Sequence, residues 1–201
     1  MEELIAGYRR YRTARWPHLR KLHQELARGQ KPRLLVIGCS DSRVDPATIF
    51  DASPGELFII RNVANLAPPY ELGGGYHGTS AAIEFAVVNL EVDTILILGH
   101  AGCGGVAAAL APQVQAANSF LDAWVSLLDP TKERIKGRGG DPHEALEHES
   151  IRVTMENLLT FPFVKRRVDA GVLVLTGARY GVADGTLEVY DAATDTFAKV
   201  E

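Results

Sequence analysis

Two short apolar stretches that each end in a glycine place the strongest constraint on the fold of this chain. Residues 34–37 lead into Gly38, and residues 94–98 lead into Gly99. Branched apolar runs of this length, closed by glycine, are typical of strands buried on both faces, as in parallel sheets covered by helices. Because such sheets hold ligands at the carboxyl ends of their strands, we expect the residues after each glycine to lie at the mouth of a cleft.

The residues that follow the two glycines are of types that bind metals. Cys39, Asp41 and Arg43 follow the first stretch. His100 and Cys103 follow the second in an H-x-x-C spacing. If the two strands are neighbours, two thiols and one imidazole meet at one point. This donor set suits Zn²⁺ and leaves a fourth position open, which is the arrangement of a catalytic zinc.

Three other interpretations of these residues remain open: a disulfide, a pair of inert core thiols, and a phosphate-binding turn. Cys39 and Cys103 are the only cysteines, and a disulfide between them is disfavoured because nothing in the sequence marks the chain as secreted. Inert core thiols would not explain His100 or the glycines beside both cysteines. Phosphate binding at the turn 100–105 is disfavoured because neither a P-loop nor a dinucleotide fingerprint fits.

The composition is that of an ordinary soluble globular protein. A length of 201 residues fits one domain with a full-sized core. A hydrophobic content of 46% and a charged content of 23% are ordinary for such a protein. A net charge of −4 gives no basic surface and argues against a nucleic-acid partner. No apolar run approaches the roughly 20 residues that cross a membrane. The first residues lack the apolar core of a signal peptide, so we expect a cytoplasmic protein with no membrane partner.

The pattern predicts an α/β fold with a helical arm over 1–30, whose second helix begins at Pro17, and a single α/β domain over 31–201. We expect a mainly parallel four-stranded sheet plus one antiparallel edge strand, with helices on both faces. The parallel strands are predicted at 33–38, 56–62, 94–99 and 172–178, and the edge strand at 186–191, followed by a polar tail. Helices are predicted at 44–50, 79–91, 112–128, 142–160 and 162–169, a further one leads from the turn 100–105 as far as residue 110, and a mobile excursion is expected at 129–141. His143 and His148 on the helix 142–160 are expected to be surface residues.

These motifs resemble those of the β-class carbonic anhydrases. The resemblance rests on the CSDSR run at 39–43 together with GHAGCGG at 99–105, and also on residues 54–65 and 78–87. It is specific from about 30 to 105 and looser on either side. The resemblance implies zinc-dependent, reversible hydration of CO₂ to bicarbonate and a proton. It also implies self-association as a dimer or a dimer of dimers, with the N-terminal arm lying across a partner subunit.

The resemblance implies a role for each residue of the motifs. Cys39, His100 and Cys103 would hold Zn²⁺. Asp41 would accept the hydrogen bond of the hydroxide and aim its lone pair at CO₂. Arg43 would bond to Asp41 through both arms of its guanidinium, fixing its rotamer and keeping it ionised.

The resemblance also implies a substrate pocket. Gln30 would hydrogen-bond the substrate, as in plant-type enzymes of the class. Phe58, Val63 and Phe85 would provide an apolar wall, and Gly104 would line the same pocket. Plant-type enzymes carry tyrosine at the position of Phe85, so any contact made by that phenol to the substrate is missing here.

One position bears on how the site would be regulated. Val36 stands where β-class enzymes that close their site on bicarbonate carry a tryptophan, while Gly38 and Arg61 of the same anion pocket are present. Valine has no N–H to donate to an anion. Together with Gln30, this predicts a plant-type, open site in which Asp41 stays bonded to its arginine.

Two other functions remain open. A sibling hydrolase of carbonyl sulfide or carbon disulfide would use the same ligands. A non-catalytic, zinc-stabilised binding protein is the second alternative, but it would have no use for Gln30, Asp41 and Arg43 together.

Overall fold

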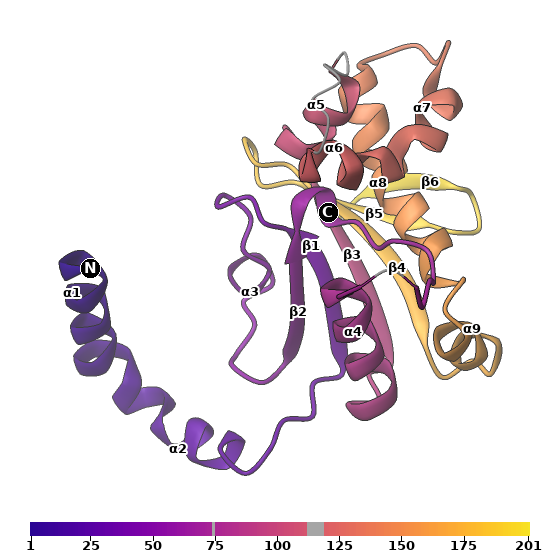
Figure 1. Cartoon of the computed structure of the whole chain (residues 1–201). Coiled ribbons are helices and arrows are strands. Elements are labelled where there is room, and N and C mark those ends of the chain that lie inside the picture. The colour runs from indigo at the N-terminus through magenta and orange to yellow at the C-terminus, as the bar shows by residue number, and fades with distance from the viewer. Residues whose placement is uncertain (74, 112–118) are drawn as a thin grey trace.

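The computed structural model describes residues 1–73, 75–111 and 119–201, and one sheet runs through them in the order β2-β1-β3-β4-β5-β6 (Figure 1). Its strands are β1 (Leu34–Cys39), β2 (Leu57–Asn62), β3 (Thr94–His100), β4 (Val174–Tyr180), β5 (Leu187–Asp191) and β6 (Thr196–Lys199). The first four are parallel to one another, and β5 and β6 are antiparallel. The predicted α/β fold with a parallel four-stranded sheet is therefore confirmed.

The end of the chain differs from the expectation of a single antiparallel strand followed by a polar tail. The tail forms a second antiparallel strand, β6, which pairs with β5 through a tight hairpin that sets Asp191 opposite Thr196. Only Phe197 of β6 is partly buried. The centroid of its ring lies 4.2 Å from that of His148, which belongs to a helix far away in the sequence. A four-residue strand with one half-buried side chain gives too short an alternation to recognise in the sequence.

The helices of the described residues largely follow the predicted segments. They are α1 (Glu2–Arg10), α2 (Trp16–Leu26), α3 (Pro46–Ile49), α4 (Gly78–Glu84), α5 (Gly104–Leu110), α6 (Phe120–Val125), α7 (Asp129–Ile135), α8 (Pro142–Leu158) and α9 (Pro162–Asp169). A π-helical segment, Tyr11–Arg15, joins α1 to α2, and these helices form an arm that extends away from the sheet (Figure 1). No residue of α1 or α2 is buried.

Two predicted segments need comment. The expected mobile excursion at 129–141 is wrong, because α7 forms there and buries Thr131 and Ile135. Arg134 of α7 makes two bonds to Glu156 of α8, at 2.7 and 2.8 Å, so α7 is held by a partner that the local sequence does not contain. Of the predicted helix 112–128, residues 112–118 lie outside the described residues.

Helices cover both faces of the sheet, as predicted. Leu35, Ile37, Ile95 and Ile97 face the layer of α4, α8 and α9. Val36, Leu96 and Leu98 face the other way, where residues of α3 pack on them. Because β1 and β3 are adjacent and parallel, their carboxyl ends meet at one edge of the sheet. Among the described residues, no helix combines the length and the apolar character needed to cross a membrane.

Candidate metal centre

The two adjacent strands bring Cys39, His100 and Cys103 together at this edge. Cys39 ends β1, His100 ends β3, and Cys103 is the N-cap of α5. Their ligand atoms all lie within 4.8 Å of one another, and the two Sγ atoms are 3.9 Å apart. Each of the three residues is buried. Two sulfurs and one imidazole nitrogen at these separations can surround a single cation.

The imidazole of His100 is set up as a metal ligand. Its Nδ1 lies 3.1 Å from the carbonyl oxygen of Ala101, to which it donates. This bond places the proton on Nδ1 and leaves the lone pair of Nε2 free. Nε2 is buried and has no hydrogen-bond partner among the described residues. A buried, unpartnered nitrogen beside two thiols is what a metal-binding histidine requires.

The two thiols share one negative charge when no cation is bound. The hydrogen bond from Cys103 lowers the pKa of the Cys39 thiol to about 4. The same contact raises the pKa of Cys103, because a second buried thiolate would repel the first. Burial lowers the pKa of His100, but the adjacent Cys39 thiolate outweighs burial and raises it. A divalent cation would remove this conflict by neutralising both thiolates, so the donor set fits Zn²⁺.

An ion pair borders the cluster. Arg43 donates to Oδ1 of Asp41 from its Nε at 3.0 Å and from its backbone N–H at 2.9 Å, and to Oδ2 from Nη2 at 2.7 Å. These bonds hold the pKa of Asp41 well below its usual range. Nη2 also donates to the carbonyl oxygen of Gly102, which ties the pair to the H-x-x-C turn. Oδ2 of Asp41 lies 3.9 Å from Nε2 of His100, so an ionised carboxylate faces the cluster.

Arg61 lies behind this pair, and its Nε and Nη2 groups are bonded to the backbone. Its guanidinium donates to the carbonyl oxygens of Cys39, Asp41 and Val44 at 2.8, 2.6 and 2.9 Å. Val36 is fully buried in the sheet.

The comparisons with known proteins agree with this geometry. A family model described as carbonic anhydrase matches residues 34–187, which is most of the chain. The chain belongs to the β-carbonic anhydrases. Beta carbonic anhydrase 3 of Arabidopsis thaliana is 34% identical over 199 residues, which cover 95% of this chain and 77% of that protein. Members of this family are lyases.

Solved structures of β-carbonic anhydrases share the fold. The structure of the β-carbonic anhydrase CcaA is 34% identical, with a TM-score of 0.88 over 100% of this chain and 99% of that chain. One of two tetrameric β-carbonic anhydrases of Sordaria macrospora is 28% identical, with a TM-score of 0.74 over 94% of this chain and 92% of that chain. The Coccomyxa β-carbonic anhydrase in complex with acetazolamide is 25% identical, with a TM-score of 0.81 over 93% of this chain and 84% of that chain.

The residues predicted to line the substrate pocket fall into two groups. Val63 and Gly104 lie beside the cluster, where Val63 opens the turn after β2 and Gly104 opens α5. Gly105 packs so closely on this turn that a Cβ there would lie 2.5 Å from Val63 and 3.2 Å from the backbone nitrogen of Ala64. Ala64 itself has a φ of 63°, so the turn is strained and close packing holds it.

The second group lies away from the cluster of the same chain. Phe58 pairs with Leu35 in the sheet, which is about 13 Å along the strand from the carboxyl end. Its ring lies 5.9 Å from that of Phe85, which is 43% exposed. Gln30 follows the arm, is exposed, and makes no side-chain hydrogen bond within the described residues.

Two features near the cluster were missed in the sequence. A cavity of about 440 Å³ beside Val63 is lined by Asn62, Thr79, Phe120, Leu121 and Trp124. Glu147 of α8 accepts the backbone N–H of Cys103 at 3.1 Å. The helical spacing of the sequence could have indicated Glu147, because this residue shares the buried face of α8 with Ser150, Ile151 and Thr154. A carboxylate buried on such a face needs a partner.

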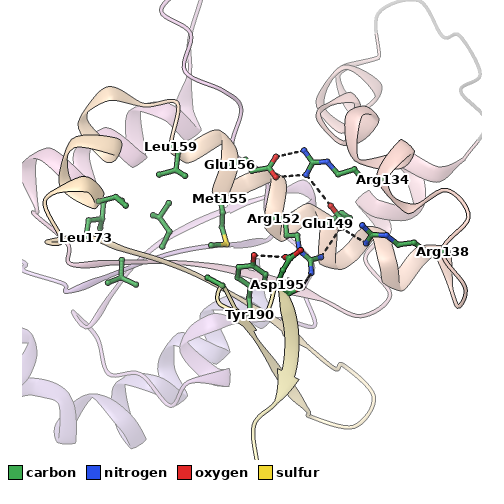
Figure 2. Close-up of a pocket in the computed structure, with 15 residues that line it drawn as sticks. Arg134, Arg138, Glu149, Arg152, Met155, Glu156, Leu159, Leu173, Tyr190 and Asp195 are labelled. Atoms are coloured by element: carbon green, nitrogen blue, oxygen red, sulfur yellow. Dashed lines mark hydrogen bonds and ion pairs between the residues drawn. The ribbon is translucent and has the colours of Figure 1, made fainter.

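A cavity of about 750 Å³ does not contain this chemistry. It lies between α8, the start of β4 and the β5–β6 hairpin, and none of the three clustered residues lines it (Figure 2). One end is apolar, and the other holds Glu149 among Arg134, Arg138 and Arg152, each of which is paired with a carboxylate. The cluster of Cys39, His100 and Cys103, not this cavity, is the candidate chemical centre among the described residues.

Proposed function

We propose that this chain catalyses the reversible hydration of CO₂ to bicarbonate and a proton, with Zn²⁺ held by Cys39, His100 and Cys103. The observation that carries the proposal is the buried, unpartnered Nε2 of His100 between two thiols, with the Asp41–Arg43 pair facing it. Zinc, when bound, supplies a Lewis acid that lowers the pKa of a coordinated water from about 15.7 to near 7.

The protein residues orient the reactants around that water. Asp41 remains ionised at neutral pH, because Arg43 holds its pKa low, and therefore acts only as a hydrogen-bond acceptor. Asp41 accepts a hydrogen bond from the attacking water and thereby turns the lone pair of the water oxygen toward CO₂. Arg43 keeps Asp41 in this rotamer through two guanidinium bonds and one backbone bond.

A second copy of the chain is proposed to complete the apolar wall for CO₂. Phe58 lies too far along β2 to reach the cluster of its own chain, and Phe85, which begins the π-helical segment Phe85–Asn89 and lies beside Phe58, is exposed. Gln30 likewise stands at the base of an arm with no buried residue. The three residues are therefore available to the site of a partner in a dimer or a dimer of dimers. Tetrameric assembly of the Sordaria macrospora relative supports association of this kind.

The site is proposed to stay open at neutral and mildly alkaline pH. All three bonds between Arg43 and Asp41 would have to break before Asp41 could turn away. An anion behind the site would find Nε and Nη2 of Arg61 bonded to three backbone carbonyls and Val36 without a donor. The rate of hydration should therefore rise with pH as a single, non-cooperative ionisation.

A stopped-flow assay of CO₂ hydration on zinc-loaded protein tests this function. Release of sulfide from carbonyl sulfide, measured on the same sample, tests the sibling hydrolase, and turnover of neither substrate would leave a zinc-stabilised binding protein. A steep, multi-proton activation curve would refute the open site. Buried thiol ligands also support the proposal of a reducing, cytoplasmic location.

A further inference from the structure

A carboxylate lies buried directly behind one of the cluster's cysteines. Glu147 of α8 is 1% exposed. Its Oε1 accepts the backbone N–H of Cys103 at 3.1 Å and lies 2.8 Å from Nδ1 of His143. Its Oε2 accepts Nε of Arg179 at 2.8 Å. His143 was expected at the surface, but it is half-buried here because it pairs with Glu147.

The bond to Cys103 fills a place that the helix itself cannot fill. Cys103 is the N-cap of α5, so its backbone N–H takes no part in the hydrogen bonds of that helix. In a capping box, a Glu or Gln at the third helical position reaches back to this N–H. Here that position is Val106, which has no acceptor. Glu147 therefore supplies from another helix the acceptor that the local sequence lacks.

Glu147 is itself held from the sheet. Arg179 lies in β4 directly beside Gly99, the residue before His100 in β3. The same guanidinium reaches Glu188 of β5 at 3.1 Å through Nη1. The carboxylate of Glu147 is thereby fixed between the turn that carries Cys103 and the strand that flanks His100, so it cannot move without breaking an ion pair.

We propose that Glu147 is a positioning residue that fixes the backbone of Cys103 and thereby sets the affinity of the site for zinc. The inference rests on the zinc site proposed above. Glu147 touches no reacting atom, and it acts through the orientation of the Cys103 peptide. Loss of a partner of this kind typically costs 10- to 100-fold in metal affinity.

Glu147→Gln tests the proposal with little change of shape. The amide has one acceptor oxygen in place of two, so its NH₂ group faces either Cys103 and His143 or Arg179. In the first case the bond to the Cys103 peptide is lost, and in the second its acceptor is no longer held from the sheet. We expect the affinity for zinc, measured by competition with a chelator, to fall by about 10- to 100-fold. In the Co²⁺-loaded protein, the thiolate-to-metal absorption should shift, because the Cys103 sulfur is held differently.

Glu149→Gln is the matched control. Glu149 lies on the same helix, is also 1% exposed, and binds Arg138 and Arg152 at the charged end of the cavity in Figure 2. It has no hydrogen bond to the metal cluster among the described residues. We expect this variant to lose stability while it keeps the wild-type affinity for zinc and the wild-type Co²⁺ spectrum.

The outcomes separate this inference from the proposed function. Wild-type protein that binds no zinc would refute both. Zinc binding by the wild type with equal affinity in Glu147→Gln, or equal losses in both variants, would refute the positioning role alone. If Glu147→Gln does not fold, hydrogen exchange of the Cys103 backbone amide in wild-type, zinc-free protein tests the bond to Glu147 instead. Slow hydrogen exchange there supports the bond to Glu147, and exchange at the rate of a free amide overturns it.

Discussion

Replacing Asp41 with asparagine keeps the shape of the side chain but removes its negative charge and one hydrogen-bond acceptor. The amide oxygen can keep both bonds that Oδ1 accepts from Arg43, at 2.9 and 3.0 Å. The NH₂ group then stands where Oδ2 accepts Nη2 at 2.7 Å, so a donor meets a donor. Oδ2 is also the atom that faces His100 at 3.9 Å. The acceptor that is lost is therefore the one directed at the metal cluster.

The size of the effect follows from the strength of that bond. A hydrogen bond to a charged group contributes about 1.5–3 kcal/mol. The side chain of Asp41 is 17% exposed, so solvent weakens the bond and the lower half of the range applies. A loss of about 1.5–2.2 kcal/mol from the transition state corresponds to about a 10- to 40-fold fall in kcat/KM.

Stopped-flow hydration of CO₂ with a pH indicator measures this fall, and elemental analysis measures zinc in the same sample. The variant should keep its zinc, because Asp41 is not among the three clustered ligands. The pH midpoint of activity should fall, because Asp41 is ionised at neutral pH in the wild type and its negative charge beside the cluster opposes the ionisation of a coordinated water. Ser42→Ala, an exposed neighbour, is the control and should keep the wild-type rate. An Asp41→Asn variant with full zinc and an unchanged rate would refute the proposed role of Asp41.

Further predictions concern the ligands and the stability of the fold. Cys103→Ser should lose most of its zinc by elemental analysis, and full retention would contradict the ligand assignment. Gly105→Ala should lower the free energy of unfolding by about 1–3 kcal/mol in urea, because its methyl would overlap the turn after β2. Gly104→Ala, whose Cβ meets no atom within 4 Å, is its control, and equal losses would refute the packing argument. Burial raises the pKa of Glu188, but its histidine and arginine partners outweigh burial and lower the pKa. The contribution of Glu188 to the free energy of unfolding is therefore present above its ordinary pKa of 4.5 and is lost as the pH falls. Glu188→Gln should therefore melt below the wild type at pH 7, with a gap that closes in acid; a gap independent of pH would argue against this pairing.

The fold class and the metal cluster could be predicted from the sequence because their signals are local. An apolar run closed by glycine marks a buried parallel strand, and β1 and β3 both carry it. The ligands follow within a few residues of those glycines. Once two such strands are neighbours, the geometry of a parallel sheet brings their carboxyl ends together, so Cys39 and His100 meet without further information.

Other features depend on contacts between segments far apart in the chain. The helix α7 forms where a loop was expected, since Arg134 finds Glu156 on another helix. The strand β6 forms because Phe197 packs on His148. Neither contact leaves a periodic pattern in its own segment, so no local analysis could find it.

The order of residues along the chain shows which of them can bind zinc, but the packing of helices on strands sets what surrounds those residues. Phe58 and Phe85 match the motif, yet the register of β2 places Phe58 away from the cluster of its own chain. Glu147 belongs to no motif, yet it caps the backbone of Cys103 from 44 residues away. Ligand spacing is a property of neighbouring residues in the chain. Burial, register and the partner of a backbone N–H are properties of the packed fold, and they exist only once the helices lie on the sheet.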